Sequence, residues 1–363
     1  MDSSNITRAM MGSDQGAVMK VLIVKLSSLG DVVHAMPVVQ DIRRAVPGAR
    51  IDWVVERGFA PLVRRCEGVD RVIACELRRW RKSPLSADTR QAFAAFKADL
   101  QREGYDAVLD LQGLSKSALV AWLARLAPQG KRFAMANQTE GSGYEAPTRW
   151  VADVAVPLPM HIHALTRSRE LCARALAYEV PDSRSFGLRA KVQSSLDAIK
   201  SIATEPRSAG GTVALVHGTS RADKLWPVAN WIELGRALHA QGLSVALPHG
   251  NEEEARRASE IAAALPNAVV WPRLGLDELL DRLGACVGVV GVDSGLSHIA
   301  VALDLPHVQL YNFDTAWRTG PLAGAGAPRQ LSVFATPQPT VQAVWQAWEQ
   351  VSRCALPPSG AGR

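Results

Sequence analysis

A carboxylate directly after a buried strand is the first group in this sequence whose type and position could do chemistry. Residues 25–34 read KLSSLGDVVH, and Asp31 follows the apolar run Val21–Val24 and a turn that Gly30 permits. An ionised carboxylate at a strand end can accept a proton from a ligand bound there. The alternative is a plain helix cap at the start of a helix that begins at Val32. Both interpretations stay open, and one carboxylate could serve both.

The motif HGTSRADKLWP contains the residue types that hold a phosphate group. Thr219 and Ser220 are small hydrogen-bond donors, and Lys224 is a cation near a helix start. The alternative is a turn closed by its own hydroxyl groups, with the lysine in solvent. The motif follows an apolar run, so a ligand bound to it would lie at a strand end.

The motif GVDSGLSHIAVAL places a helix start directly after another apolar run. The backbone N–H groups of Ser294, Gly295 and Leu296 would point out of the helix, which favours an anion such as a pyrophosphate. Asp293 would repel a phosphate, so we expect it to cap the helix or to bind sugar hydroxyls. His298 is either structural or donates a hydrogen bond to the ligand.

Two further segments are strongly charged. PHGNEEEARR opens a helix with three glutamates, which complement the helix dipole, and one of them could accept hydrogen bonds from a ribose. RRWRK places four cations around Trp80; they are Arg78, Arg79, Arg81 and Lys82. Arginine binds a carboxylate or phosphate through two hydrogen bonds, so this cluster could hold an acidic acceptor. The alternative is a solvated loop.

These motifs are positioned by two successive series of short strands that alternate with helices, which predicts βαβ units and parallel sheets. We expect strands over residues 21–25, 51–55, 71–75, 107–111, 132–135, 213–217, 244–248, 268–270, 288–292 and 307–311. We expect helices over residues 89–102, 115–126, 229–241, 252–265, 276–283, 296–303 and 340–352. The alternation weakens between residues 176 and 211, which separates two halves. Ligands bind beyond the carboxyl ends of such strands, where these motifs fall.

The composition is that of an ordinary globular protein. The chain has 363 residues, of which 47% are hydrophobic and 21% charged, and this favours two domains. The net charge of +6 suits an acidic partner without indicating nucleic acid. Five cysteines without a CxxC pair argue against a zinc site or a disulfide framework and favour a reducing compartment. The sequence contains no apolar run long enough for a membrane span and no signal-peptide core.

Taken in order, the motifs resemble those of the lipopolysaccharide heptosyltransferases, glycosyltransferase family 9. The similar segments are VLIVKLSSLGDVVHAMPVVQDIRRAVPGARIDWVVE, LRRWRK, YDAVLDLQGLSKSAL, KLWP and VDSGLSHIAVALDLP. The SSLGDVVH and RRWRK segments are similar to those of the type I branch. The segment YNFDTAWRTGP departs from the YGPTDP typical of the family.

The resemblance implies a GT-B architecture, in which two Rossmann-like, doubly wound α/β domains face each other across a cleft. Together with the strand pattern, it divides the chain into six parts. These are a disordered leader (1–18), an N-terminal acceptor-binding domain (19–180), a linker region (181–210), a C-terminal ADP-heptose-binding domain (211–340), a helix that could cross back to the first domain (341–355) and a flexible tail (356–363).

The activity that the resemblance implies is an inverting, metal-independent transfer of L-glycero-D-manno-heptose. The donor would be ADP-L-glycero-β-D-manno-heptose, and the acceptor would be a Kdo sugar of Kdo2-lipid A. The protein would then be cytoplasmic and peripheral at the cytoplasmic face of the inner membrane. The resemblance implies no cofactor and no nucleic-acid partner.

The residue roles that the resemblance implies fall on the motifs above. Asp31 is expected to be the general base that takes the proton from the acceptor hydroxyl. The expected donor contacts are Thr219, Ser220 and Lys224 at the phosphates, Glu254 at the ribose, Leu274 near the adenine, Asp293 at the heptose, the backbone of Ser294, Gly295 and Leu296 at the diphosphate, and His298 as a further polar contact. The RRWRK cations are expected to recognise the acceptor, and Trp80 to meet the lipid headgroups.

Three alternatives are weighed against this reading. A type II-like heptosyltransferase would use a later position of the lipopolysaccharide core as its acceptor. A nucleotide-dependent oxidoreductase or epimerase is disfavoured because neither half contains the GxGxxG fingerprint. A non-catalytic nucleotide-sugar-binding protein would transfer no sugar, so no rate would depend on Asp31.

Overall fold

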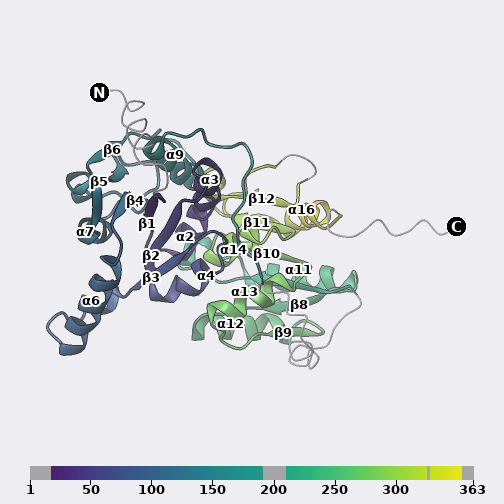
Figure 1. Cartoon of the computed structure of the whole chain (residues 1–363). Coiled ribbons are helices and arrows are strands. Elements are labelled where there is room, and N and C mark those ends of the chain that lie inside the picture. Colours follow the sequence, from purple (N-terminus) through teal and green to yellow (C-terminus); the bar gives the residue numbers. More distant parts are fainter. Residues whose placement is uncertain (1–17, 191–209, 325–327, 354–363) are drawn as a thin grey trace. The chain divides into compact units, whose positions relative to one another are not determined.

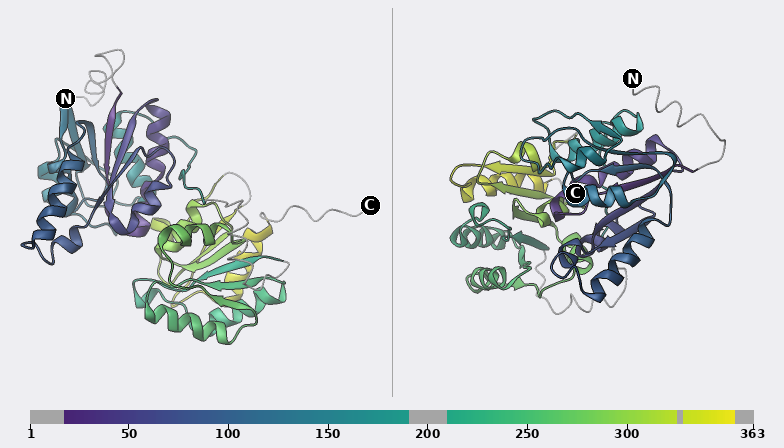
Figure 2. Two further views of the ribbon diagram at one scale, coloured as in Figure 1. Left: turned by 60° about the horizontal axis from the view of Figure 1, so that its bottom comes forward. Right: turned by 90° about the vertical axis from the view of Figure 1, so that its left-hand side faces the viewer.

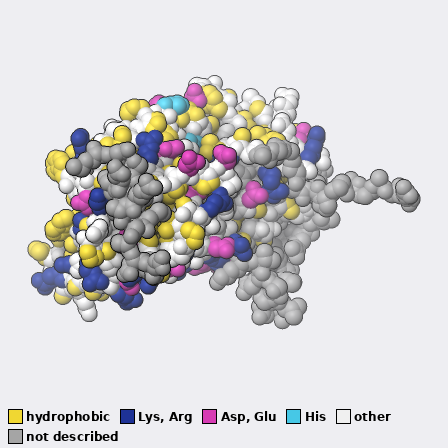
Figure 3. All heavy atoms as spheres, turned by 45° about the horizontal axis from the view of Figure 1, so that its top comes forward, with side chains coloured by type: hydrophobic (Ala, Val, Ile, Leu, Met, Phe, Trp, Pro, Cys, Tyr) yellow, Lys and Arg dark blue, Asp and Glu magenta, His cyan; other side chains and the backbone are white. Residues whose placement is uncertain are grey.

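The computed structural model describes residues 18–190, 210–324 and 328–353. The chain divides into two compact units between Arg189 and Ala190, inside the predicted linker region. Figures 1 and 2 show that each unit is a sheet covered by helices on both faces. Charged and apolar side chains are interspersed on the face that Figure 3 shows. The predicted leader up to residue 17 and the predicted tail lie outside the described residues.

Each unit contains a six-stranded parallel sheet, ordered β3-β2-β1-β4-β5-β6 in the N-terminal unit and β12-β11-β10-β7-β8-β9 in the C-terminal unit. If β7 is counted as the first strand of its unit and the second order is read from its other end, both orders are 3-2-1-4-5-6. This is the doubly wound Rossmann-like order. The predicted α/β class is therefore confirmed. The strands are β1 Lys20–Val24, β2 Arg50–Glu56, β3 Arg71–Cys75, β4 Tyr105–Asp110, β5 Leu126–Met135, β6 Val154–Val156, β7 Thr212–Val216, β8 Ser244–Leu247, β9 Ala268–Val270, β10 Gly288–Val292, β11 His307–Tyr311 and β12 Gln330–Phe334.

The helices connect successive strands and cover the two faces of each sheet. In the N-terminal unit they are α2 Leu29–Ala35, α3 Pro37–Ala45, α4 Ala60–Arg64, α5 Leu77–Trp80, α6 Ala87–Leu100, α7 Ser115–Leu123, α8 Pro147–Val151 and α9 Ala164–Leu176, with the short 3₁₀ helix η1 Arg57–Phe59. In the C-terminal unit they are α11 Val228–Ala240, α12 Glu252–Ala263, α13 Leu276–Gly284, α14 Gly295–Ala302, α15 Ala316–Thr319 and α16 Val341–Arg353, with the 3₁₀ helix η2 Ala222–Lys224. Pro37 begins α3, because its fixed φ and missing N–H suit the first residue of a helix.

Each unit buries its own apolar core. One face of the N-terminal sheet packs against α5, α6, α7 and α8 through a cluster that includes Trp80, Phe96 and Ala121. In the C-terminal unit, Trp226 and Trp231 meet edge to face in the core, with ring centroids 4.9 Å apart. The apolar side of α16 belongs to that same core and packs against β11 and β12. Within the described residues, no helix is long and apolar enough to span a membrane.

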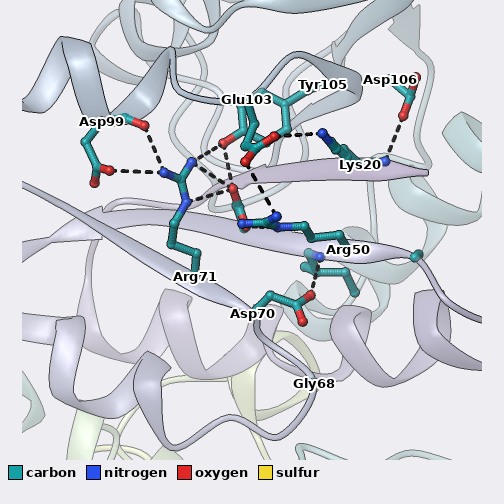
Figure 4. Close-up of polar contacts among 12 residues, drawn as sticks. Lys20, Arg50, Gly68, Asp70, Arg71, Asp99, Glu103, Tyr105 and Asp106 are labelled. Carbon is teal, nitrogen blue, oxygen red and sulfur yellow. Dashed lines mark hydrogen bonds and ion pairs between the residues drawn. The ribbon is translucent and has the colours of Figure 1, made fainter. Parts of the chain in front are cut away.

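The amino ends of the strands in the N-terminal sheet are joined by ion pairs (Figure 4). Arg71, at the start of β3, lies 2.9 Å from the buried carboxylate of Asp52, which also accepts a 2.8 Å hydrogen bond from the hydroxyl of Tyr105. Beside them, Lys20 lies 2.7 Å from Glu103. These charges hold the sheet together at the amino edge, whereas the motifs singled out in the sequence lie at the carboxyl edge.

Candidate active site

Asp31 lies in the first turn of α2, directly beyond the carboxyl end of β1. Its Oδ2 accepts hydrogen bonds from the backbone N–H and the hydroxyl of Ser28, at 3.0 and 2.7 Å. Ser28 is the N-cap residue and Asp31 the third helical residue, which is the arrangement of a capping box. The expectation that Asp31 is itself the cap of a helix beginning at Val32 is therefore wrong, because α2 begins at Leu29 and Ser28 is its cap; Asp31 contributes to capping from inside the first turn. The side chain remains 36% exposed, so capping leaves part of the carboxylate open to a ligand.

A buried lysine lies beneath this carboxylate. Nζ of Lys25 is 3.7 Å from Oδ1 of Asp31 and donates a 2.8 Å hydrogen bond to the carbonyl of Leu111. Burial lowers the pKa of Lys25 and raises the pKa of the neighbouring Asp110 to about 6. Burial also acts to raise the pKa of Asp31, but the Lys25 charge and the Ser28 hydrogen bonds outweigh it and hold that pKa below its ordinary value. Asp31 is thus ionised at neutral pH, which is the form that a general base requires.

The loop between β1 and α2 is fixed by residues that follow β4. Oε1 of Gln112 accepts hydrogen bonds from the backbone N–H groups of Leu26 and Ser27, each at 3.1 Å. Nζ of Lys116 donates a 2.8 Å hydrogen bond to the hydroxyl of Ser27. The position of Asp31 therefore depends on two neighbouring strands of the sheet, β1 and β4, and not on its own helix alone.

The RRWRK motif forms α5 and the turn after it, in the same N-terminal unit. Its four cations, Arg78, Arg79, Arg81 and Lys82, are exposed as expected. Trp80 is buried instead and packs against the rings of Phe93 and Phe96, with centroids 5.6 and 5.4 Å apart. The expectation that Trp80 meets lipid headgroups is therefore wrong, because one turn of helix directs the indole into the core and the cations outward.

Two carboxylates lie beside these cations. Glu76 pairs with Arg79 at 3.0 Å and with Arg57 at 3.3 Å. Glu56, at the end of β2, is buried, and burial raises its pKa although the backbone and charge of Arg78 oppose that rise. The cations of the motif outnumber the carboxylates near them, so the surface keeps an excess of positive charge for an acidic ligand.

Asp293, at the end of β10, is the centre of a polar cluster in the C-terminal unit. Its Oδ2 lies 2.5 Å from Nζ of Lys224, and its Oδ1 lies 3.4 Å from Nε2 of both His298 and Gln309. Asp293 is buried, and burial acts to raise its pKa. The hydrogen bond and charge of His298, together with those of Lys224, outweigh burial and lower that pKa below its ordinary value. The carboxylate is therefore held ionised by its partners.

The start of α14 lies directly after Asp293. Ser294 occupies the N-cap position and Gly295 is the first helical residue, so the alternative in which Asp293 caps this helix is wrong. The hydroxyl of Ser297 instead donates a 2.6 Å hydrogen bond to the carbonyl of Val292, which ties the first turn to the strand. The backbone N–H groups of Ser294, Gly295 and Leu296 have no acceptor within an α-helix and favour an anion at this end.

The remaining residues predicted to contact the donor follow neighbouring strands of the same sheet. The hydroxyl of Thr219, after β7, donates a 3.2 Å hydrogen bond to the backbone carbonyl of Asp293, and Ser220 beside it is exposed. Glu254, after β8, accepts a 2.7 Å hydrogen bond from the backbone N–H of Gly250. The half-buried Leu274 lies in the loop after β9.

The loop after β7 and the start of α12 also touch. A Cβ atom at Gly218 would come within 2.7 Å of the carboxyl carbon of Glu254, so a larger residue there would displace the Glu254 side chain. The strands β10, β7, β8 and β9 are consecutive in the sheet. The structure thus brings the predicted donor residues to one edge, with Glu254 beside the Thr219 loop and Leu274 one strand further away.

Asn312 is a site residue that the sequence reasoning missed. Its amide nitrogen donates 3.0 Å hydrogen bonds to the backbone carbonyls of Asp223 and Leu225, on either side of Lys224. The neighbouring Phe313 lies under the guanidinium of Arg221, 5.9 Å from its ring centroid. The segment YNFDTAWRTGP therefore departs from the family sequence but has a clear structural role, because it holds the loop that presents Lys224. The sequence did contain a signal for this residue, because Asn312 is a polar residue directly after the carboxyl end of β11.

The comparisons with known proteins agree with this geometry. The model of glycosyltransferase family 9 (heptosyltransferase) matches residues 93–339. Lipopolysaccharide heptosyltransferase 1 of Escherichia coli (strain K12) is 38% identical over 294 residues, which are 81% of this chain and 88% of that protein. The chain belongs to glycosyltransferase family 9. As a member of the heptosyltransferase family it is a glycosyltransferase, and the oxidoreductase and epimerase alternatives are therefore excluded.

Solved structures of heptosyltransferases share the fold. The structure of E. coli heptosyltransferase WaaC with ADP is 34% identical in sequence and has a TM-score of 0.77. The match covers 92% of this chain and 100% of the WaaC chain. The structure of the same protein with ADP-2-deoxy-2-fluoro heptose has a TM-score of 0.73 at 34% identity and covers 91% and 99%. The predicted GT-B class is therefore confirmed for this family member.

Proposed function

We propose that this family 9 glycosyltransferase transfers L-glycero-D-manno-heptose from ADP-L-glycero-β-D-manno-heptose to a Kdo sugar of Kdo2-lipid A. The observation that supports this most directly is the state of Asp31. It is an ionised, partly open carboxylate at the carboxyl edge of the N-terminal sheet, in the same unit as the exposed RRWRK cations. A base and a cluster of cations are what an anionic sugar acceptor with a nucleophilic hydroxyl needs.

The proposed reaction is a single displacement. The acceptor hydroxyl oxygen attacks the anomeric carbon of the heptose, and its proton passes to a carboxylate oxygen of Asp31. The bond between the anomeric carbon and the β-phosphate oxygen breaks, and the electron pair leaves with ADP. Because attack and departure occur on opposite faces, the anomeric configuration inverts and no covalent sugar–enzyme intermediate forms.

The donor half of the site suits the negative charge that develops on the leaving ADP. A lysine ammonium has three donor hydrogens, so Lys224 can keep its bond to Asp293 and still donate to a phosphate oxygen. The backbone N–H groups at the start of α14 supply further donors that need no reorientation during reaction. Asp293, oriented by His298 and Gln309, is left to accept hydrogen bonds from heptose hydroxyls. The WaaC structures with ADP and with a fluorinated ADP-heptose support a donor of this class.

The acceptor assignment rests on charge and on the relatives. Kdo carries a carboxylate and lipid A carries phosphates, and both classes of anion suit arginine and lysine. A relative named lipopolysaccharide heptosyltransferase 1 favours the first heptose position over a later one. A lipid-anchored acceptor implies that the protein works at a membrane surface, as a peripheral protein at the cytoplasmic face of the inner membrane.

Mass spectrometry of the product tests the proposal. Wild-type protein with ADP-heptose and Kdo2-lipid A should add the mass of one heptose, whereas an acceptor that already has its first heptose should gain none. The opposite pattern would establish the type II-like alternative. No mass gain on either acceptor would refute the proposed function.

Asp31→Asn tests the base. Asparagine keeps the shape and the helix-capping oxygen but removes the charge, so the transfer rate should fall by roughly 10²- to 10⁴-fold. Asp106→Asn is the matched control, because Asp106 accepts a hydrogen bond from Lys20 at the opposite, amino edge of the same sheet. A wild-type rate for Asp31→Asn would show that another group takes the proton.

A further inference from the structure

Two tryptophans stand on the surface of the N-terminal unit. Trp122 on α7 is 61% exposed and Trp150 on α8 is 79% exposed, and Leu119 lies one turn before Trp122 with 43% exposure. The helices α7 and α8 pack against each other. Trp53, Trp226 and Trp231 are fully buried, and tryptophan side chains in proteins are highly buried on average. We call Leu119, Trp122 and Trp150 the tryptophan surface.

The two helices that present this surface are held together at both ends. At the start of α7, the carboxylate of Glu145 accepts hydrogen bonds from the backbone N–H and the hydroxyl of Ser115, the first of them 2.8 Å long. At the end of α7, the guanidinium of Arg132 donates to the carbonyls of Ala121 and Trp122 at 2.8 and 3.3 Å. The backbone N–H of Arg132 donates to Asp153, just after α8, at 2.8 Å. The tryptophans therefore project from a fixed scaffold.

Positive charge surrounds the tryptophan surface. Residues 115–153 contain five lysines and arginines against three carboxylates, which leaves a net charge of +2, and the pair of Arg132 with Asp153 at 3.7 Å cancels one charge of each sign. Arg125 and Arg149 are exposed, next to the ends of the two helices. The surface is thus apolar at its centre and basic around it.

The RRWRK loop belongs to the same layer of the molecule. Trp80 of α5, Phe96 of α6 and Ala121 of α7 are part of one core cluster, against which Val151 of α8 also packs. The exposed residues of these helices and of the loops between them include the RRWRK cations, the 84% exposed Leu85 that follows them, and the tryptophan surface. On the side where α6 and α7 lie in Figure 1, Figure 3 shows apolar and basic side chains next to each other.

We propose that this layer, α5 to α8, is the face with which the protein docks on an anionic phospholipid bilayer, with Trp122 and Trp150 entering the headgroup region. Tryptophan is enriched at membrane interfaces because its large apolar ring and its N–H suit the boundary between acyl chains and water. Arginine and lysine beside it are attracted by anionic headgroups. Apolar side chains and basic residues supply the two signals that stable peripheral binding needs.

The charge around the surface favours a bilayer over a second copy of the chain. Two mostly exposed tryptophans and a half-exposed leucine offer roughly 400 Å² of apolar area, given about 150–250 Å² for one fully buried aromatic side chain. A symmetric contact between two copies would bring the basic residues around this area face to face with the same residues of the partner, whereas anionic headgroups would neutralise them. The docking proposal rests on the proposed function to the extent that a lipid A acceptor places the reaction at a bilayer.

Vesicle flotation tests the docking face. The probes are vesicles of phosphatidylethanolamine and phosphatidylglycerol, and vesicles of phosphatidylcholine alone. Wild-type protein should float with the anionic vesicles and less with the neutral ones. Trp122→Ser with Trp150→Ser should lower the partition coefficient by at least about tenfold, because the apolar area lost is that of two large side chains. Met160→Ser with Phe334→Ser is the matched control, since both residues are exposed apolar side chains outside this layer, and it should float like wild type.

Three results would overturn the proposal. Wild-type protein could fail to float with anionic vesicles, or the tryptophan double variant could float as well as wild type. A wild-type dimer in sedimentation velocity without lipid, converted to a monomer by the double variant, would assign the surface to a second copy instead.

Transfer assays separate this proposal from the proposed function. With Kdo2-lipid A in anionic vesicles, the tryptophan double variant should lose rate relative to wild type, whereas with a deacylated, water-soluble acceptor the two should react equally fast. Equal loss on both acceptors would refute the docking role. If wild type transfers heptose to neither acceptor, the proposed function fails, and the flotation result alone decides on the docking face.

Discussion

The ion pair between Lys224 and Asp293 gives the sharpest test of the donor half of the site. The two charged atoms are 2.5 Å apart, and only 19% and 7% of the two side chains are exposed. At an effective dielectric constant of about 20, unit charges at that distance attract each other by roughly 6–7 kcal/mol. Lost hydration offsets much of this, and removing one partner of a buried pair costs about 3–5 kcal/mol. Since Asp293 keeps His298 and Gln309, we expect Lys224→Met to lower the free energy of unfolding by about 2 kcal/mol.

A double-mutant cycle measures this coupling. Lys224→Met, Asp293→Asn and the double variant are compared by urea unfolding, followed through the fluorescence of the buried Trp226 and Trp231 in the same unit. The double variant should be more stable than the sum of the single effects by about 1–2 kcal/mol. Additivity within about 0.5 kcal/mol would show that the pair contributes no net stability and would refute the reasoning.

The neighbouring pair supplies a control in the same loop. Arg221 and Asp223 are also paired but are 60% and 43% exposed, so solvent screens their attraction and Arg221→Met should lower the free energy of unfolding far less than Lys224→Met. Lys224→Met should in addition slow heptose transfer by roughly 10²- to 10³-fold, because the hydrogen-bond donor that we propose for the leaving diphosphate is lost. An unchanged transfer rate would show that Lys224 only stabilises the fold.

Three further predictions concern other buried ionisable side chains. Lys25→Met should move the acid limb of the pH–rate profile to higher pH, because the Lys25 charge lowers the pKa of Asp31. Arg169→Leu should lower the free energy of unfolding by about 3–5 kcal/mol in urea titrations, because it leaves the buried Asp41 carboxylate without the guanidinium that contacts it at 2.6 Å. His307 is buried, and burial lowers its pKa to about 4. Between pH 6.5 and 4 the unfolded chain therefore binds a proton that the native chain does not, and the free energy of unfolding falls as the pH falls. His307→Gln should remove about one proton from that pH dependence, as measured by unfolding titrations at several pH values.

Each of these predictions has a contrary outcome. An acid limb unmoved by Lys25→Met would mean that another group sets the ionisation of the base. Arg174→Leu, which breaks a largely exposed pair with Glu170, should cost less than about 1 kcal/mol, and an equal cost for Arg169→Leu would contradict the burial argument. An unchanged pH dependence in His307→Gln would show that other groups account for acid destabilisation.

The strands and site motifs that could be predicted were those that a short stretch of sequence reveals by itself. Ten runs of apolar residues became strands because both sheets are parallel and buried on both faces. The missed strands are β6 and β12, which lie at sheet edges and are only partly buried. Ser332 interrupts the apolar residues of β12, and the apolar sequence VAV of β6 has only three residues. The residues after strand ends were found because a parallel sheet gathers ligands at its carboxyl edge.

The partners of the site residues could not be predicted, because they come from distant positions. Lys25 read as the last residue of a strand, and nothing local shows that its ammonium lies beneath Asp31. Gln309 lies inside the apolar run of β11 and reaches Asp293 only because β10 and β11 pair in register. Trp80 was misplaced because the direction of a side chain in one turn of helix depends on the core beneath it, which includes Phe93 and Phe96 from α6.

The separate cores of the two units have a consequence for how such an enzyme can change. The proposed base and the acceptor cations depend on one hydrophobic core, whereas the proposed donor residues depend on another. Substitutions that reshape the acceptor surface can therefore accumulate without disturbing the packing behind the nucleotide-sugar residues. A chimera joined between Arg189 and Ala190 to the N-terminal half of another heptosyltransferase would inherit its sugar donor from one parent and its acceptor from the other.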